Sequence, residues 1–289
     1  MKTKTVLSKI IAGTMTWGAW GKKASSSEMI DLIECCLACD ITTFDHADIY
    51  GDYTTELEFG AAFAQSKINR KNIQIVTKCG IQSLSKNRDT IVKHYDYSKK
   101  HIIWSVENSL KNLQTDYLDV LLLHRPSPLL QTDEVAEAIE NLKQQGKIID
   151  FGLSNFSPTQ TELIMQKTTV AYNQIQFAAT HFEPMVNGSL DFMQLHKIQP
   201  MSWNPLGSVF KEDSDQSKRI KKVLLQLEQK YNLPDDIILL SWVMQHPAKV
   251  KPVIGTSNFD RIKAIQKVIS LSLQDWFLLY EASLGTKVA

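Results

Sequence analysis

Residues 42–51 of this 289-residue chain read Thr-Thr-Phe-Asp-His-Ala-Asp-Ile-Tyr-Gly. The run opens with β-branched and aromatic residues, which are typical of a strand, and then places a carboxylate at Asp45 and a phenol at Tyr50. Taken alone, an aspartate at a strand end can be a cap, and a tyrosine in the next loop can be a packing group. The meaning of this stretch therefore depends on what the rest of the chain brings beside it.

Short apolar runs of the strand type alternate with longer helical patterns along the whole chain, which predicts βαβ units and a parallel sheet. The eight predicted strands are Lys9–Met15, Thr42–Phe44, Ile73–Lys78, Asp119–His124, Ile149–Leu153, Ala171–Gln176, Gln199–Trp203 and Lys251–Ile254. Helices are predicted over Ser26–Cys39, Thr55–Gln65, Lys99–Leu113, Thr132–Gln145, Ser157–Gln166, Leu190–Leu195, Asp215–Tyr231, Asp236–Gln245, Asn258–Val268 and Leu273–Leu284. We therefore predict an α/β fold, a single (β/α)8 TIM barrel over residues 1–289, with its active site at the carboxyl ends of the strands.

Helix starts and loops support this division. Caps are expected at Ser25-Ser26-Ser27-Glu28, at Thr132-Asp133-Glu134 and at Ser157-Pro158. The longest irregular stretch, Gly80–Tyr97, is polar, and we expect an exposed loop over the mouth of the barrel.

Composition excludes several kinds of partner. The chain has 32 basic and 31 acidic residues, so its net charge of +1 favours neither nucleic acid nor an anionic membrane. No apolar run reaches about 18 residues, and the first seven residues lack the apolar core of a signal peptide. We expect a cytoplasmic protein that acts on a small molecule, with a monomer as the default because the sequence does not reveal the oligomeric state.

The four cysteines, Cys35, Cys36, Cys39 and Cys79, are expected to be reduced thiols in that compartment. Cys36-Leu37-Ala38-Cys39 has the C-x-x-C spacing, but it lies late in a predicted helix, away from the amino-terminal dipole that activates redox thiols. Core packing is the favoured interpretation, with a redox pair or a three-thiol metal site as alternatives. No metal site is predicted elsewhere.

Four ionisable residues stand at the predicted carboxyl ends of neighbouring strands. Asp45 ends the second strand, Lys78 the third and His124 the fourth, while Tyr50 follows Asp45. A lysine ammonium at roughly 4 Å would attract a phenolate by about 4 kcal/mol, before desolvation opposes it. Asp45 would orient Lys78, and His124 could donate a hydrogen bond to a carbonyl oxygen. Together they form a general-acid site suited to carbonyl reduction.

Several stretches in the right order resemble the aldo-keto reductase family. They are residues 13–18 (Gly-Thr-Met-Thr-Trp-Gly), 44–51, 109–124, 152–156 (Gly-Leu-Ser-Asn-Phe) and 255–258 (Gly-Thr-Ser-Asn), with His-Arg-Pro at 124–126 as in a bacterial oxidoreductase branch. The resemblance implies a tetrad of Asp45, Tyr50, Lys78 and His124, with Tyr50 as proton donor. It also implies a nicotinamide cofactor lying across the barrel mouth without a Rossmann domain, and no G-x-G-x-x-G motif is present.

The resemblance further implies which residues hold that cofactor. Ser154, Asn155 and Gln174 would bind the carboxamide, and Trp203 would stack on the nicotinamide ring. The other implied contacts are Asn204, Leu206 and Ser208 along the pyrophosphate, Gly255, Ser257 and Arg261 at the adenosine end, and Thr14, Met15 and Asp45 from the first two strands. A guanidinium can fork onto a 2′-phosphate, so Arg261 favours NADP(H) over NAD(H).

Structural alternatives exist for these groups. Ser154-Asn155 could be a helix cap, Trp203 could be barrel core, and Arg261 could lie on a solvated helix face. Trp203 and Asn204 stand where many relatives have tyrosine and serine, and the stretch from Gly255 lacks the lysine that many relatives use for the 2′-phosphate. The chain ends soon after the last predicted helix, which suggests an open pocket.

Three functions remain. NADPH-dependent reduction of small aldehydes or ketones is favoured, and the intact His124 separates it from a nicotinamide-binding sensor or regulatory subunit. An aldolase-like Schiff base on Lys78 is disfavoured because Asp45 and Tyr50 are expected to pair with that lysine. A metal hydrolase lacks the H-x-H or H-E-x-x-H spacing.

Overall fold

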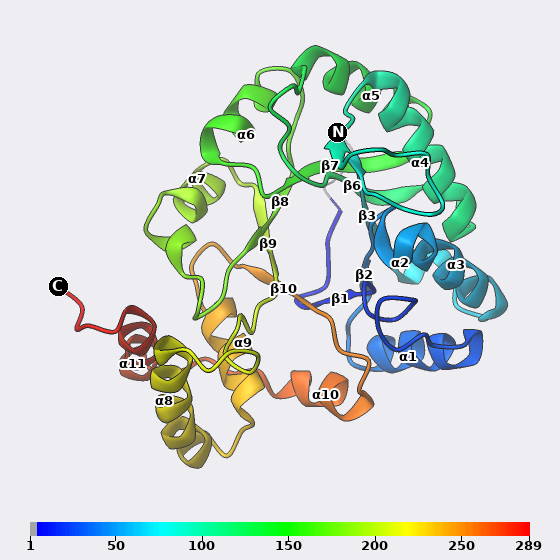
Figure 1. Ribbon diagram of the computed structural model, residues 1–289. Coiled ribbons are helices and arrows are strands. Elements are labelled where there is room, and N and C mark those ends of the chain that lie inside the picture. Colours follow the sequence, from blue (N-terminus) through cyan, green and yellow to red (C-terminus); the bar gives the residue numbers. More distant parts are fainter. Residues whose placement is uncertain (1–4) are drawn as a thin grey trace.

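The computed structural model describes residues 5–289 and forms a closed parallel barrel of eight strands in the order β1-β10-β9-β8-β7-β6-β3-β2. Figure 1 looks along the barrel, with the strands at the centre and helices around them. The barrel strands are β1 (Ile11–Gly13), β2 (Thr43–Asp45), β3 (Gln74–Cys79), β6 (Leu118–Leu123), β7 (Ile148–Ser154), β8 (Tyr172–Gln176), β9 (Gln199–Trp203) and β10 (Lys251–Ile254). The predicted (β/α)8 TIM barrel is confirmed.

Helices follow the strands around the outside of the barrel (Figure 1). The α-helices are α1 (Ser26–Ala38), α2 (Tyr50–Tyr53), α3 (Thr55–Gln65), α4 (Lys99–Leu113), α5 (Thr132–Gln144), α6 (Pro158–Met165), α7 (Ser189–Leu195), α8 (Asp215–Tyr231), α9 (Asp235–Met244), α10 (Phe259–Ala264) and α11 (Leu273–Leu284). Short 3-10 turns lie at Arg70–Asn72, Glu183–Met185 and Ile265–Lys267. The last helix, α11, packs beside α8 (Figure 1).

The core has two layers because successive strand residues point to opposite faces of a sheet. Val120 and Leu122 on β6 belong to a small buried cluster inside the barrel. Leu121 and Leu123 on the same strand belong to the larger cluster that also contains residues of the surrounding helices. Side chains with the parity of Val120 therefore face the barrel axis, and this parity decides which strand residues can reach the mouth.

Some predicted boundaries are wrong for local reasons. The first strand covers only Ile11–Gly13, since the Ser8 hydroxyl bonds the Ile10 carbonyl before it and a turn from Thr14 to Trp17 follows it. Ser25 and Ser157 form the expected capping boxes. The predicted cap at Thr132 is wrong, because Thr132 lies inside α5 and Gln131 precedes it without a side-chain cap bond.

The predicted loop over Gly80–Tyr97 contains a small antiparallel hairpin, β4 (Ile81–Gln82) with β5 (His94–Tyr95). The connection between these strands is held by Arg88, whose guanidinium lies 4.3 Å from the Tyr53 ring centre and 4.5 Å from that of Trp104. These cation–π contacts attach the loop to α2 and α4. Within residues 5–289 no helix is long and apolar enough to cross a membrane; part of the stretch inspected for a signal peptide lies outside the described residues.

Candidate functional site

The four predicted catalytic residues lie at the carboxyl end of the barrel around the Lys78 ammonium. Lys78 Nζ donates to Asp45 Oδ2 at 2.7 Å, to the His46 carbonyl at 2.8 Å and to the Tyr50 hydroxyl at 3.1 Å. The His124 ring lies 6.1 Å from the Tyr50 ring, nearly perpendicular to it. The three protons of the ammonium are thus directed to three oxygens, one of which is the tyrosine hydroxyl.

Strand register explains why Asp45 and Lys78 meet. Asp45 pairs with Val76 across β2 and β3, and Val76 belongs to the inner cluster. Lys78 is two residues beyond Val76, so it points to the same interior face. Both side chains of the ion pair are almost fully buried, at 3% and 1% exposure. A buried ion pair of this kind requires further hydrogen bonds, and Gln174 Nε2 supplies one to Asp45 Oδ1 at 2.9 Å.

Tyr50 comes from an irregular turn rather than from a strand. The residues after it, Gly51, Asp52 and Tyr53, all have positive φ values of 61°, 58° and 69°. Two consecutive non-glycine residues in this region indicate local backbone strain, which proteins tolerate mainly where surrounding contacts impose it. Here the Thr54 hydroxyl donates to the Gly51 carbonyl and the Tyr53 hydroxyl accepts from Ser83 N, and these bonds hold the turn.

The attraction expected between Lys78 and the Tyr50 phenolate does not decide the direction of the Tyr50 pKa shift. Burial raises the pKa of the Tyr50 phenol, and the attraction of Lys78 lowers it by less, so the net shift is upward. For Lys78, burial acts to lower the pKa, but Asp45 and Tyr50 raise it above its usual value. The site therefore combines a protonated phenol with a charged ammonium, because desolvation of the phenolate outweighs a single nearby cation.

His124 is held neutral. Burial lowers its pKa well below the usual range, and the cations Lys78, Arg125 and Lys93 lower it further. Its Nδ1 atom is buried without a hydrogen-bond partner among the described residues. A neutral imidazole carries one N–H donor and one acceptor, so His124 can serve as a hydrogen-bond donor without adding charge.

A second layer of buried polar residues supports the site. His46 is fully buried and shares a 2.8 Å hydrogen bond with the Thr14 hydroxyl. Burial lowers the pKa of His46 to about 3, with Lys78 contributing. Behind β3, Glu56 is buried and accepts from the Thr77 hydroxyl at 2.6 Å.

Asp48 and Glu56 have no role that could be predicted from the sequence. Burial raises the pKa of Asp48 to about 8, and one of its oxygens, Oδ1, has no partner among the described residues. Glu56 stands in the first turn of α3, where an acidic residue is ordinary on any solvent-facing helix. No local pattern therefore distinguished it from a surface residue.

The three predicted carboxamide-binding residues, Ser154, Asn155 and Gln174, lie on or directly after the neighbouring strands β7 and β8, and the predicted stacking residue, Trp203, is joined to them. Trp203 Nε1 donates to Asn155 Oδ1 at 2.8 Å, and Asn155 Nδ2 donates to Ser154 Oγ at 2.9 Å. Asn155 has a φ of 64°, a conformation that asparagine tolerates better than most residues. The Trp203 ring is thereby oriented at the mouth, while Gln174 is engaged with Asp45.

The remaining predicted cofactor residues are spread around the mouth in the loops after β1, β9 and β10. Thr14 is fully buried with its hydroxyl bonded to β2 and His46, whereas Met15 beside it is exposed. Asn204 accepts from Lys211 Nζ at 3.0 Å and has a φ of 51°. Half-buried Leu206 and Ser208 follow it, and Ser208 N donates to Thr180.

After β10 the chain is more open. Gly255 is exposed and accepts from the Thr16 hydroxyl at 2.7 Å, and Ser257 is half-buried. Arg261 is exposed on α10, a helix capped by Asn258. Within residues 5–289 its guanidinium forms no ion pair or hydrogen bond. An oriented aromatic ring, nearby amides and a free guanidinium fit a nicotinamide dinucleotide, which needs a stacking surface, polar groups for the carboxamide and positive charge for phosphate.

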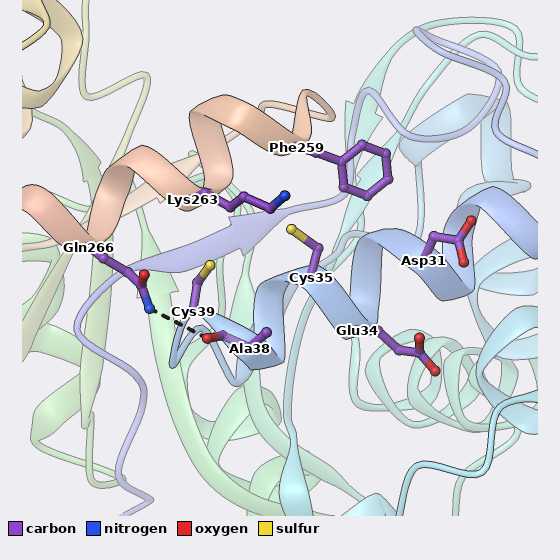
Figure 2. A pocket seen from close by; sticks show the side chains of 8 residues that line it. All are labelled: Asp31, Glu34, Cys35, Ala38, Cys39, Phe259, Lys263 and Gln266. Carbon is purple, nitrogen blue, oxygen red and sulfur yellow. Dashed lines mark hydrogen bonds between the residues drawn. The ribbon is translucent and has the colours of Figure 1, made fainter.

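Cys35, Cys36 and Cys39 lie at the end of α1, away from this mouth, whereas Cys79 is buried next to Lys78 at the end of β3. Figure 2 shows Cys35 and Cys39 in a cleft between α1 and α10, with Lys263 and Gln266 on the opposite side. Burial raises the pKa of Cys36 to about 12, and no disulfide is formed. Burial also raises the pKa of the Cys39 and Cys79 thiols, so Cys36, Cys39 and Cys79 behave as packing residues rather than as activated thiols. No cluster of three or more potential metal ligands occurs within the described part of the chain.

A closed parallel barrel with ionisable residues at the carboxyl ends of its strands places the protein in the class of (β/α)8 barrel proteins. The model of the aldo/keto reductase family matches residues 9–279. The chain belongs to the aldo/keto reductase family, and it is therefore a nicotinamide-dependent oxidoreductase.

Named relatives agree with this assignment. An uncharacterised oxidoreductase of Bacillus subtilis, YcsN, is 41% identical over 286 residues, covering 96% of this chain and 95% of its own. A 6-dehydroglucose reductase of Agrobacterium fabrum is 35% identical, covering 100% of this chain and 98% of its own. The structure of an aldo/keto reductase from Klebsiella pneumoniae in complex with NADP and acetate superposes with a TM-score of 0.78 at 23% identity, covering 94% of this chain and 90% of that one.

Proposed function

We propose that this protein reduces small aldehydes or ketones to alcohols with NADPH, and that Tyr50 donates the proton. The observation that carries the proposal is the 3.1 Å hydrogen bond from the buried Lys78 ammonium to the Tyr50 hydroxyl. Burial keeps the phenol protonated, which is the form a proton donor needs. The relatives named as reductases support the direction of the reaction.

Each residue has a defined task in this proposal. The bound nicotinamide supplies the hydride. As negative charge develops on the carbonyl oxygen, the Tyr50 O–H transfers its proton to it, and the nearby Lys78 ammonium stabilises the phenolate that remains. Asp45 holds Lys78 charged and oriented. Neutral His124 donates a hydrogen bond to the same carbonyl oxygen and adds no competing positive charge.

The cofactor would be held by the residues described around the mouth. Trp203 would stack on the nicotinamide, Ser154, Asn155 and Gln174 would contact its amide, and Asn204, Leu206 and Ser208 would line the pyrophosphate. Gly255 and Ser257 would contact the adenosine end, with Met15 and Thr14 near the first strand. The unpaired Arg261 supports NADP(H) over NAD(H), because a guanidinium can bind the 2′-phosphate through two hydrogen bonds.

The test follows NADPH oxidation with a reactive neutral aldehyde. Tyr50→Phe removes the proton and keeps the ring, and we expect kcat to fall by about 10²- to 10⁴-fold. Tyr117→Phe is the matched control, because Tyr117 precedes β6 at the opposite end of that strand from His124, and phenylalanine keeps the ring that packs against Arg70. Full activity in Tyr50→Phe would exclude Tyr50 as the donor.

Calorimetric titration with NADPH and with NADH tests the cofactor preference. We expect NADPH to bind more tightly than NADH. Arg261→Gln should reduce the ratio of the two affinities about tenfold. Tight NADPH binding combined with turnover below about 10⁻² per second on every aldehyde would favour a nicotinamide-binding regulatory protein instead.

A further inference from the structure

Arg125 is a cation at the mouth of the barrel that the proposed reduction does not use. It follows His124 directly and is half-buried. Its guanidinium carbon lies 5.6 Å from the centre of the Trp203 ring, and its charge reaches both Tyr50 and His124. Arg125 therefore faces the space between the predicted proton donor and the predicted nicotinamide platform.

Hydrogen bonds hold the backbone of Arg125, whereas its guanidinium has no hydrogen-bond or ion-pair partner among the described residues. The hydroxyl of buried Tyr97 donates to the Arg125 carbonyl and accepts from Arg125 N at 3.0 Å. Pro126 further restricts the backbone of Arg125 to extended conformations. Over the described residues 5–289, the guanidinium has no carboxylate partner and no side-chain hydrogen bond, and it lies over the Trp203 ring.

Three cations, Lys78, Arg125 and Lys93, act on His124 at this part of the mouth. Asp45 is already bound to Lys78 and Gln174, so it does not neutralise Arg125. Lys93, on the hairpin loop, adds a second cation whose field reaches His124. A half-buried guanidinium that lacks a counter-ion is poorly compensated, and a carboxylate is the group that its paired N–H donors fit best.

We propose that Arg125 binds a carboxylate on the substrate, so that the preferred substrates are aldehydes or ketones that carry an acid group. This inference rests on the proposed carbonyl reduction and names its substrate class. The carbonyl lies at Tyr50, and the acid group lies at Arg125 on the Trp203 side of the mouth. Exposed Trp20, whose ring is 6.2 Å from that of Tyr50, provides an apolar wall for the part between them.

The experiment compares meta- and para-carboxybenzaldehyde with their methyl esters, which have nearly the same shape but no charge. The readout is the ratio of kcat/KM for each acid to kcat/KM for its ester. Because hydrogen bonds to charged groups are strong, Arg125→Gln should lower this ratio by about ten- to a hundredfold, and Arg125→Lys should lower it less. Raising the salt concentration should lower the wild-type ratio. Lys218→Gln, on exposed α8, is the charge control and should not change the ratio.

The outcomes separate this inference from the proposed function. Reduction of acids and esters with a ratio unaffected by Arg125→Gln would overturn the role of Arg125 and leave the reductase intact. If no aldehyde is reduced, the proposed function fails. Calorimetry with benzoate then tests whether Arg125 binds a carboxylate. Benzoate binding that is lost in Arg125→Gln supports the site, and equal binding in both proteins overturns it. Circular dichroism of each variant confirms that it is folded.

Discussion

Removing the charge of Asp45 should destabilise the protein more than removing any surface charge. In Asp45→Asn, the Lys78 ammonium keeps its hydrogen bonds to the His46 carbonyl and the Tyr50 hydroxyl but loses its counter-ion. Unit charges 2.7 Å apart at an effective dielectric of 20 attract by about 6 kcal/mol, and the asparagine oxygen recovers part of this as a hydrogen bond. Breaking one side of a buried pair typically costs about 3 to 5 kcal/mol, and we expect a loss in that range.

The pH dependence of this loss has a defined sign. In the wild type the pKa of Lys78 is raised, so its stabilising contribution is present below the unfolded lysine pKa of about 10.4 and is lost as pH rises through the folded value. Without Asp45, the strongest effect opposing burial is lost and the folded pKa of Lys78 falls. The variant then gains stability relative to the wild type as pH rises from about 7 to about 10, because folded Lys78 can release its proton.

Urea denaturation followed by circular dichroism measures both effects. The control is Glu137→Gln, which breaks the Lys99–Glu137 pair at a similar 2.9 Å but with side chains 46% and 63% exposed. We expect that control to change the free energy of unfolding by less than about 1 kcal/mol. A loss below about 1 kcal/mol in Asp45→Asn, or a deficit that widens toward high pH, would refute the proposed electrostatics of the site.

Three further predictions test the surroundings of the site. Burial raises the pKa of Asp48 to about 8, so the stability that Asp48 contributes is present below its unfolded pKa of about 3.9 and is lost as the pH rises toward 8. The free energy of unfolding of Asp48→Asn should therefore rise relative to that of the wild type between about pH 4 and about pH 8. Parallel pH profiles in the two proteins would contradict this. A Cβ on Gly60 would lie 2.0 Å from a backbone oxygen of α4, whereas one on Gly146 meets nothing within 4 Å. Gly60→Ala should therefore cost about 3 kcal/mol in thermal melting and Gly146→Ala, with only its positive φ to strain it, about 1 kcal/mol. Trp203→Phe removes the hydrogen-bond donor to Asn155, and NADPH titration should show about fivefold weaker binding. Unchanged affinity would show that this hydrogen bond does not contribute to NADPH binding.

The sequence by itself determined the barrel and the positions of the charged strand ends. Strand and helix periodicities are set within a few residues, so eight alternating units could be recognised without tertiary information. The same two-residue period places Lys78 on the interior face with Val76. Boundaries were less accurate where a hydroxyl or a turn ended an element, as Ser8 does near the first strand.

Only the tertiary structure decided the pKa shifts, the hydrogen bonds and the charge pairing of the site. The upward shift in the Tyr50 pKa depends on how completely the closed barrel removes water, which no local pattern reports. The bond between Trp203 and Asn155 joins residues 48 positions apart. No local pattern marked Glu56, and Arg125 stood out only as part of the His-Arg-Pro motif. The fold buries Glu56 beside Thr77 and leaves Arg125 without a counter-ion at the mouth. Periodicity is a local property of the chain, whereas desolvation and charge pairing exist only after the barrel has closed.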